Sequence, residues 1–356
     1  MLLIVLPSVA GSVPEKLRNA QAELHLHAPR GMLASMWSQL NKYIPADDPA
    51  YSDARRRVLS RLGEYAASVI EPLKLRPTAA TLLFETAERI EVRVSTPVRH
   101  VVLVISPEGD LGGEVFFLRA VAAKNVPAPQ MLQHDLSRTA MPFAYALEGY
   151  VSGSPATMLP DGPLLRMVAR QVGRALRRIH SIAAPGFGQP VANGRWPARS
   201  WHDVLRHWLK QREYHMRAQE VLGPALLDRL HAATLDHPAL DCIEPRVVHG
   251  AVDSAHIVAS VGENAQLEAL VRPGSIVGGD PMFDLAHALL ARHPATFRQG
   301  VWEAYMAAGA LDSAQAARFE RLRLLLHVVD TLDRADATEL DRLPNDVAAA
   351  LREIGG

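Results

Sequence analysis

Hydrophobic residues recur with two different periods along this chain, and the change of period separates it into parts. Residues 54–73 place apolar side chains at every third or fourth position, which predicts an amphipathic helix. From residue 81 onward the pattern changes to short runs rich in β-branched residues, which predict strands. Five strands are predicted, at residues 81–85, 89–95, 100–106, 130–134 and 143–150, with one helix at residues 112–125 before the fourth.

The helical period returns after residue 153 and continues almost to the end of the sequence. Helices are predicted at residues 164–182, 201–222, 224–233, 294–308, 313–332 and 345–354, with two short strands near residues 257–258 and 267–271. The predicted fold class is therefore α+β. Residues 76–152 are expected to form a five-stranded antiparallel lobe with one helix, and residues 153–356 a mostly helical lobe.

Residues 1–75 are expected to form a small α/β extension or cap in front of these lobes. Its first residues lack the basic start of an export signal, and Pro7 interrupts a short apolar run, so a buried strand is predicted there. His25 and His27 share one face of a second predicted strand. With no third ligand nearby, a solvated or partner-facing edge is preferred to a metal site.

The composition excludes several classes of function. Lys plus Arg and Asp plus Glu both number 38, so no overall field attracts nucleic acid or an acidic membrane. No segment has the ~20 apolar residues of a membrane span, and a cytoplasmic location is expected. Cys242 is the single cysteine, which excludes a disulfide framework and is interpreted as a buried filler. The spacing of His202, His207 and His215 does not put two metal ligands on one helix face.

The most informative stretch combines two motifs. Val-Val-His-Gly at residues 247–250 opens a polar loop, and Gly-Asp-Pro-Met-Phe-Asp-Leu-Ala at residues 279–286 begins a predicted helix. Together they resemble the aminoglycoside phosphotransferase and choline kinase family, and the resemblance extends over residues 78–330. It implies a two-lobed, protein-kinase-like fold and ATP-dependent phosphoryl transfer.

Several positions depart from the family pattern. In the family's register, Ala251 stands at the catalytic Asp, His256 at the metal-binding Asn and Arg272 at the metal-binding Asp. Val104 stands at the ATP-binding Lys, and the turn at residues 86–89 has no glycine to approach a triphosphate. An alanine cannot accept a proton, and a guanidinium cannot bind a divalent cation.

The resemblance also implies which residues keep a structural role. His249, Asp280 and Asp284 are expected to form a buried, hydrogen-bonded brace that holds the loop.

Three further residues are candidates for binding a ligand or an anion, namely Arg272, Glu114 and Glu148. Glu114 matches the family's helix glutamate, lacks its lysine partner and is expected to be stabilised by the helix dipole. No metal site is predicted.

Two functions follow from this pattern. The first is a pseudokinase-like binding or scaffold protein for a partner protein, a peptide or a small ligand, and one version places it in a peptide or natural-product modification complex. No cofactor is expected in that case. The alternative is a rewired phosphotransferase acting on a small molecule or on peptide Ser/Thr hydroxyls, in which Asp253 works with His249 or His256 and requires ATP and Mg²⁺.

Overall fold

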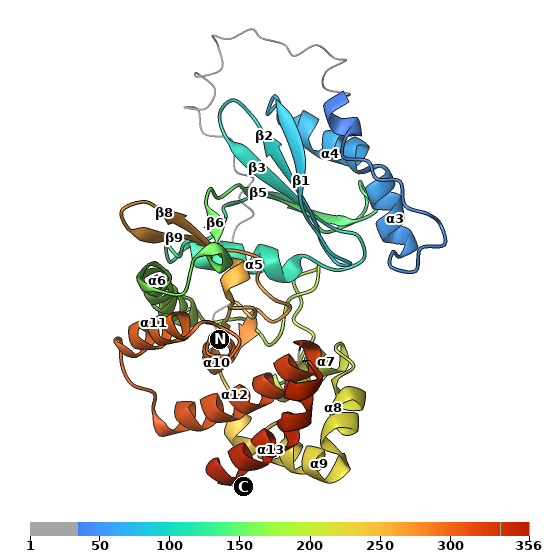
Figure 1. The fold of residues 1–356 in the computed structure, drawn as a ribbon. Helices are drawn as coiled ribbons and strands as arrows, with labels where there is room; N and C mark the ends of the chain where they lie inside the picture. Colours follow the sequence, from blue (N-terminus) through green and yellow to red (C-terminus); the bar gives the residue numbers. More distant parts are fainter. Residues whose placement is uncertain (1–34, 335, 356) are drawn as a thin grey trace, which may run out of the picture.

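The structure is a computed structural model that describes residues 35–334 and 336–355. The strands and helix predicted before residue 35, together with His25 and His27, lie outside the described residues. The described chain folds into two lobes, with the smaller lobe above the larger one in Figure 1. This is the two-lobed α+β architecture that the sequence predicts.

The small lobe is an antiparallel sheet of five strands in the order β1-β2-β3-β5-β4. The strands are β1 (Ala79–Glu85), β2 (Ile90–Ser95), β3 (His100–Ser106), β4 (Met131–Asp135) and β5 (Ala144–Gly149), and the helix between β3 and β4 is α5 (Gly112–Ala122). Glu91 lies opposite Val104 in the sheet, and Glu148 lies opposite Val102. Because Val104 packs with Val115 of α5, the two glutamates lie on the sheet face that turns to α5.

Two helices cover the other face of the sheet. They are α3 (Asp53–Ser60) and α4 (Leu62–Ile70), which replace the single helix predicted at residues 54–73 because the backbone leaves the helical region at Arg61. Both helices contribute to the hydrophobic cluster between them and the sheet. This part of the predicted extension therefore belongs to the core of the small lobe. The cluster includes Leu59, Leu62, Ile70, Ile90, Val92, Leu103, Ile105 and Leu147.

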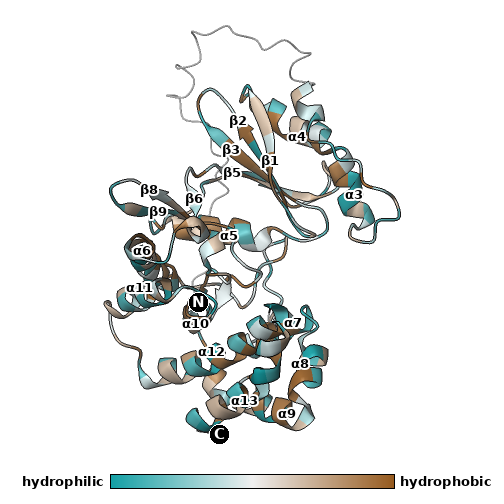
Figure 2. Ribbon diagram, in the orientation of Figure 1, coloured by the Kyte–Doolittle hydropathy of each residue, from teal (hydrophilic) through white to brown (hydrophobic). Residues whose placement is uncertain are grey.

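The large lobe is mostly helical, and its helices carry the alternating hydrophobic and hydrophilic stretches coloured in Figure 2. They are α6 (Pro163–His180), α7 (Trp201–Lys210), α8 (Tyr214–Leu222), α9 (Pro224–Ala233), α10 (Pro281–Ala288), α11 (Ala295–Met306), α12 (Ser313–Arg334) and α13 (Ala337–Glu353).

Two helix boundaries in this lobe differ from the prediction. The helix predicted at residues 201–222 is two helices, because Glu213 adopts a left-handed backbone conformation with φ 53° between them. The last helix begins well before residue 345, because Asp336 caps it by accepting the N–H groups of Thr338 and Glu339.

Short strands of the large lobe precede the loops that lie beneath the small lobe. β7 (Arg246–Val247) pairs with β10 (Gly278–Gly279), and β8 (Ile257–Val261) pairs with β9 (Ala265–Leu270) and with β6 (Ser154–Pro155). The loop after β7 and the loop after β9 thereby come together beneath the small lobe. Among the described residues, no helix is both long enough and apolar enough to cross a membrane.

Candidate functional site

One buried carboxylate holds the loop that follows β7. Oδ1 and Oδ2 of Asp284, in the first turn of α10, accept the backbone N–H groups of Gly250 and His249 over 2.7 and 2.6 Å. Nε2 of His180 lies 3.1 Å from Oδ2 of the same carboxylate. Burial opposes the charged form, but the contact with His180 and the backbone N–H groups lower the pKa of Asp284 below its ordinary value. Asp284 therefore acts as an ionised acceptor at the base of the loop.

His249 joins this brace through its backbone N–H, and its ring makes no hydrogen bond to it. It is fully buried, and neither ring nitrogen has a hydrogen-bond partner among the described residues. The ring packs edge-on against Phe117 of α5, with the two centroids 5.3 Å apart. Because burial lowers the pKa of His249 to about 4, its imidazole is neutral at neutral pH. His249 contributes its backbone N–H to the brace and its ring to packing.

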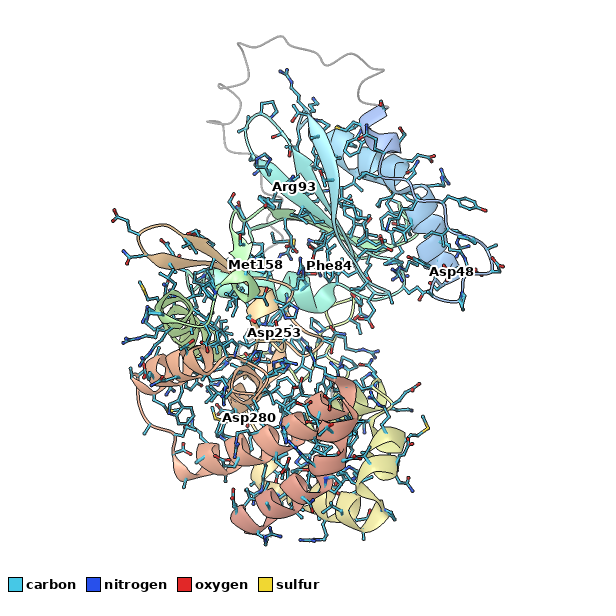
Figure 3. All side chains as sticks on the ribbon, viewed as in Figure 1. Asp48, Phe84, Arg93, Met158, Asp253 and Asp280 are labelled. Atoms are coloured by element: carbon cyan, nitrogen blue, oxygen red, sulfur yellow. The ribbon has the colours of Figure 1, made fainter. Side chains whose placement is uncertain are left out.

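Asp253 caps the next turn of the loop. Its Oδ1 accepts the N–H groups of Ala255 and His256 over 2.7 and 3.2 Å, at the start of a short 3-10 turn, η4 (Ser254–His256). Nδ1 of His256 lies 2.7 Å from the carbonyl oxygen of Ala251. Burial raises the pKa of Asp253, but the neighbouring His256 and the N–H of Ala255 lower it overall. Asp253, labelled near the junction of the lobes in Figure 3, uses Oδ1 to fix the loop conformation.

Asp280 holds the start of α10 deeper in the large lobe. Its Oδ1 accepts the N–H of Met282 over 2.8 Å, and Oδ2 lies 2.6 Å from Nε of Arg318. The pKa of Asp280 is nevertheless raised, because its burial outweighs these contacts. Only Asp284 braces the loop as the sequence predicted, whereas Asp280 holds the start of α10. Their partners Arg318 and His180 come from α12 and α6. His180 lies near the end of the helix predicted at residues 164–182, in a stretch similar to the family's long helix, but its contact with Asp284 was not predicted.

Arg272 reaches from the large lobe to the small lobe. It follows β9 with a left-handed φ of 54°, and its guanidinium donates from Nε and Nη2 to the two oxygens of Glu91 over 2.8 and 3.0 Å. The guanidinium also lies over the ring of Phe84 in β1, 4.1 Å from the centroid. The sequence predicted Arg272 as a ligand- or anion-binding residue, and the anionic group that it pairs with in the structure is the carboxylate of Glu91.

A second arginine completes an ion-pair cluster between the lobes. Arg89, at the end of the β1–β2 turn, donates from Nη1 and Nη2 to both oxygens of Glu114 over 2.5 and 2.7 Å, and from Nε to Glu91 over 2.5 Å. Glu114 thus has an arginine partner, which corrects the expectation that the helix dipole alone stabilises it. The ion pairs of Arg89 and Glu91 were not predicted from the sequence. Their period-two spacing within the second predicted strand was the available signal.

Glu148 of β5 is the third carboxyl group of this interlobe cluster. It is 5% exposed, and its Oε1 has no hydrogen-bond partner among the described residues. Burial and the adjacent carboxylate of Glu114 raise the pKa of Glu148 well above its ordinary value, with Arg89 acting in the opposite direction. A neutral Glu148 leaves the charges of two arginines balanced by Glu91 and Glu114.

The side chains that the sequence resemblance predicts at the family's catalytic and metal-binding positions do not match the chemistry of Mg²⁺. Magnesium prefers hard oxygen ligands in an octahedral arrangement. Ala251 offers a methyl group, His256 has already placed one ring nitrogen against a backbone carbonyl, and Arg272 presents a positive charge. Among the residues that the structure describes, no group of three or more His, Cys, Asp or Glu side chains could hold a metal ion.

A cavity of about 470 Å³ lies beside the loop that follows β9. Its wall includes Ser275 and Ile276 after Arg272, the segment 187–198, and side chains of α7. Polar groups of Asp203 and other residues share the lining with apolar ones. The cavity has the size and mixed lining of a small-molecule site.

Solved phosphotransferase structures share this fold. Aminoglycoside phosphotransferase APH(4)-Ia matches with a TM-score of 0.58 and 18% identity, covering 82% of this chain and 99% of that chain. Macrolide 2'-phosphotransferase MphH from Brachybacterium faecium matches with a TM-score of 0.51 and 18% identity, covering 81% of this chain and 97% of that chain. At these identities the likeness shows the kinase-like fold. No curated protein matches the chain significantly.

The family assignment rests on the sequence model of the phosphotransferase enzyme family, APH, which matches residues 85–325. The matched span begins in β1, passes through α5 and the loop braced by Asp284, and ends in α12. It covers more than half of the 356 residues. This chain therefore belongs to the APH phosphotransferase enzyme family.

Proposed function

We propose that this chain is a binding or scaffold member of its family, in which an ion-pair cluster stands where nucleotide and metal would bind. The observation that carries the proposal is the pairing of Arg272 with Glu91 across the two lobes. Glu91 also accepts a hydrogen bond from Nε of Arg89, whose remaining donors bind Glu114. The cluster neutralises itself, so neither guanidinium remains free to bind the phosphates of a nucleotide.

The chemistry of phosphoryl transfer supports the same conclusion. Transfer needs a phosphate cradle, metal ions held by carboxylate and amide oxygens, and a base that positions the acceptor hydroxyl. In the family's register these last positions hold His256, Arg272 and Ala251, and none of them supplies the required oxygen. We therefore propose that the protein functions without ATP or Mg²⁺.

A binding role suits the parts of the fold that the chain keeps. The brace at Asp284 preserves the loop, and the cavity beside Ser275 and Ile276 provides space for a small ligand. The other binding partner that we propose is a protein or a peptide. One example is a component of a peptide or natural-product modification complex.

Nucleotide binding tests the proposal directly. The purified full-length chain is titrated calorimetrically with ATP, ADP and GTP, each with Mg²⁺ and with EDTA, and its melting temperature is followed in parallel. We expect no heat of binding and no rise in melting temperature. Arg272→Ala and its matched surface control Arg174→Ala, which changes an exposed arginine of α6, are titrated in the same way, and neither variant should bind nucleotide.

The opposite result would support the rewired phosphotransferase. Stabilisation by ATP with Mg²⁺ but not by Mg²⁺ alone, together with transfer to an acceptor that Asp253→Asn abolishes, would overturn the proposal. Asp253→Asn retains one side-chain oxygen to cap η4, so loss of transfer in a folded variant would identify the carboxylate as the acting group.

A further inference from the structure

Arginines dominate the outer face of helix α6, which lies beside α11 at the side of the large lobe in Figure 1. The helix contains five arginines and no aspartate or glutamate. Most of its apolar residues are buried in the core of the large lobe. The side chains that form this arginine face are Arg166, Arg170, Arg174, Arg177 and Arg178.

Three of these arginines have hydrogen-bond partners, but only one partner is charged. Nη2 of Arg166 donates to the carboxylate of Glu303 over 2.5 Å. Nε of Arg177 donates to a backbone carbonyl near the end of α11 over 2.7 Å, and Nη1 of Arg178 donates to a backbone carbonyl after α5 over 2.9 Å. A backbone carbonyl is neutral. These bonds therefore hold the guanidinium groups of Arg177 and Arg178 in place without neutralising their charge.

The other two arginines of the face have no partner. Arg170 and Arg174 are exposed, and among the described residues neither side chain has a hydrogen bond or an ion pair. Only Arg166 is neutralised by a carboxylate, so the remaining members of the face keep their positive charge. A guanidinium forms its strongest hydrogen bonds with a carboxylate or a phosphate.

A hollow of about 450 Å³ lies at the start of this face, where α6 begins. Arg166 and Arg170 line it together with Met167 and Thr296. Two arginines of the face therefore share one recess in the surface. The recess can enclose the end of an acidic side chain, which an entirely flat helix face could not do.

The spacing of the arginines matches that of an extended peptide. Arg166, Arg170, Arg174 and Arg178 follow one another every fourth residue, so neighbours are ~6 Å apart along the helix axis. In an extended chain, alternate side chains point the same way and are ~6.6 Å apart. Each arginine can thus meet one side chain of a peptide that lies along α6. The long arginine side chains absorb the turn of about 40° between neighbouring positions.

We propose that the arginine face of α6 docks an extended acidic segment of a partner protein or peptide, with Asp or Glu at alternate positions. This proposal rests on the proposed binding function and names the chemistry of its partner. Nucleic acid fits the face less well, because α6 has no Phe, Tyr or Trp on which bases could stack. A membrane fits less well because the apolar residues of α6 are mostly buried and cannot enter a bilayer.

Three peptides test the match on the unmodified full-length chain, by calorimetry in a buffer of low ionic strength. The first has four glutamates that alternate with serines, the second has the same composition with its glutamates consecutive, and the third has glutamine in place of each glutamate. The alternating peptide should saturate with one site per chain. The consecutive peptide should bind about 5-fold more weakly, because only half of its carboxylates face the helix together. The glutamine peptide should not bind.

Two double variants assign the binding to the face. Arg170→Ala with Arg174→Ala should weaken the alternating peptide about 10-fold, because two exposed ion pairs are lost. Arg229→Ala with Arg342→Ala removes the same charge from exposed positions of α9 and α13 and should leave the affinity unchanged. Melting temperatures of both variants establish that they are folded.

The comparison of peptides needs no variant, so a folding defect cannot hide a failure. The proposal is overturned if the alternating peptide does not saturate, if both acidic peptides bind equally, or if the control variant loses as much affinity as the α6 variant. Tighter binding of a single-stranded oligothymidylate or of phosphatidylserine vesicles would overturn it in favour of those partners. Failure of every peptide would leave the nucleotide titrations unaffected, whereas stabilisation by ATP with Mg²⁺ would overturn the proposed function and not the peptide results.

Discussion

The guanidinium of Arg272 donates two hydrogen bonds to the carboxylate of Glu91, from Nε over 2.8 Å and from Nη2 over 3.0 Å. Arg272 belongs to the large lobe and Glu91 to β2 of the small lobe, so this pair joins the lobes directly. Burial opposes the charged form of Glu91, but Arg272 and Arg89 lower its pKa overall. A planar, bidentate pair of this kind fixes orientation as well as distance.

Removal of the guanidinium should destabilise the fold. In Arg272→Ala the carboxylate of Glu91, whose side chain is 6% exposed, keeps only Arg89 as a charged partner. We expect the free energy of unfolding to fall by about 1–3 kcal/mol, because a charge-assisted bond is lost from a buried group. Urea denaturation at neutral pH measures this difference. Arg174→Ala, on the exposed face of α6, should change stability by no more than about 0.5 kcal/mol.

A double-mutant cycle separates the pair from its surroundings. Arg272→Ala, Glu91→Gln and the double variant should give a coupling free energy of about 1–2 kcal/mol. Additive effects of the two single changes would contradict a direct interaction between Arg272 and Glu91.

The fold was largely predictable because its signals are local. The β-branched runs at residues 89–95 and 100–106 became β2 and β3, and the helix at residues 112–125 became α5, since periodicity decides which face of each element is buried. The errors were at breaks. Arg61 and Glu213 leave the helical conformation without a proline or a glycine, and their apolar neighbours continue the same period.

The candidate site was less predictable because its contacts join distant segments. The motif residues Asp280 and Asp284 were found, but Arg318 and His180 approach them from other helices. Arg272 was predicted to bind a ligand or an anion, and only the fold brings the carboxylate of Glu91 to it from a strand 181 positions away in the sequence. Partners of this kind are determined by tertiary packing, which residue type and spacing do not predict.

The buried carboxyl group of Glu148 should make stability depend on pH. Its pKa is raised in the folded state, so the folded chain binds more protons than the unfolded chain above the ordinary pKa of 4.5. The stability that Glu148 contributes is then fully present below pH 4.5 and decreases as the pH rises toward its folded pKa. Glu148→Gln, which mimics the neutral form, should flatten this decrease.

Urea denaturation at a series of pH values from mildly acidic to mildly alkaline measures the slope. Glu263→Gln, at an exposed position in the β8–β9 hairpin, is the matched control and should retain the slope of the original chain. A Glu148→Gln variant with an unchanged slope would show that Glu148 is ionised in the folded protein.

The carboxylate of Asp284 should contribute stability of the opposite pH sign. Its pKa is lowered by folding, so its contribution is present above the unfolded value of 3.8 and is lost as the pH falls through the folded value. Asp284→Asn replaces one acceptor of the brace by a donor that faces a backbone N–H. We expect the free energy of unfolding, measured by urea denaturation, to fall by about 2–4 kcal/mol at neutral pH. The loss should be smaller at a pH below 3.8. Equal losses at both pH values would contradict an ionised Asp284.

The glycine next to His249 should tolerate no side chain. Gly250 has a left-handed φ of 75°, and a Cβ atom there would lie 2.1 Å from the carbonyl oxygen of Ile276. Gly194 has a similar φ of 79°, but nothing lies within 4 Å of its Cβ position, so it isolates the conformational cost. Gly194→Ala should lose about 1 kcal/mol and Gly250→Ala about 2–5 kcal/mol in urea denaturation. Equal losses would mean that the loop moves away from Ile276 without cost, and that the brace at Asp284 does not fix it.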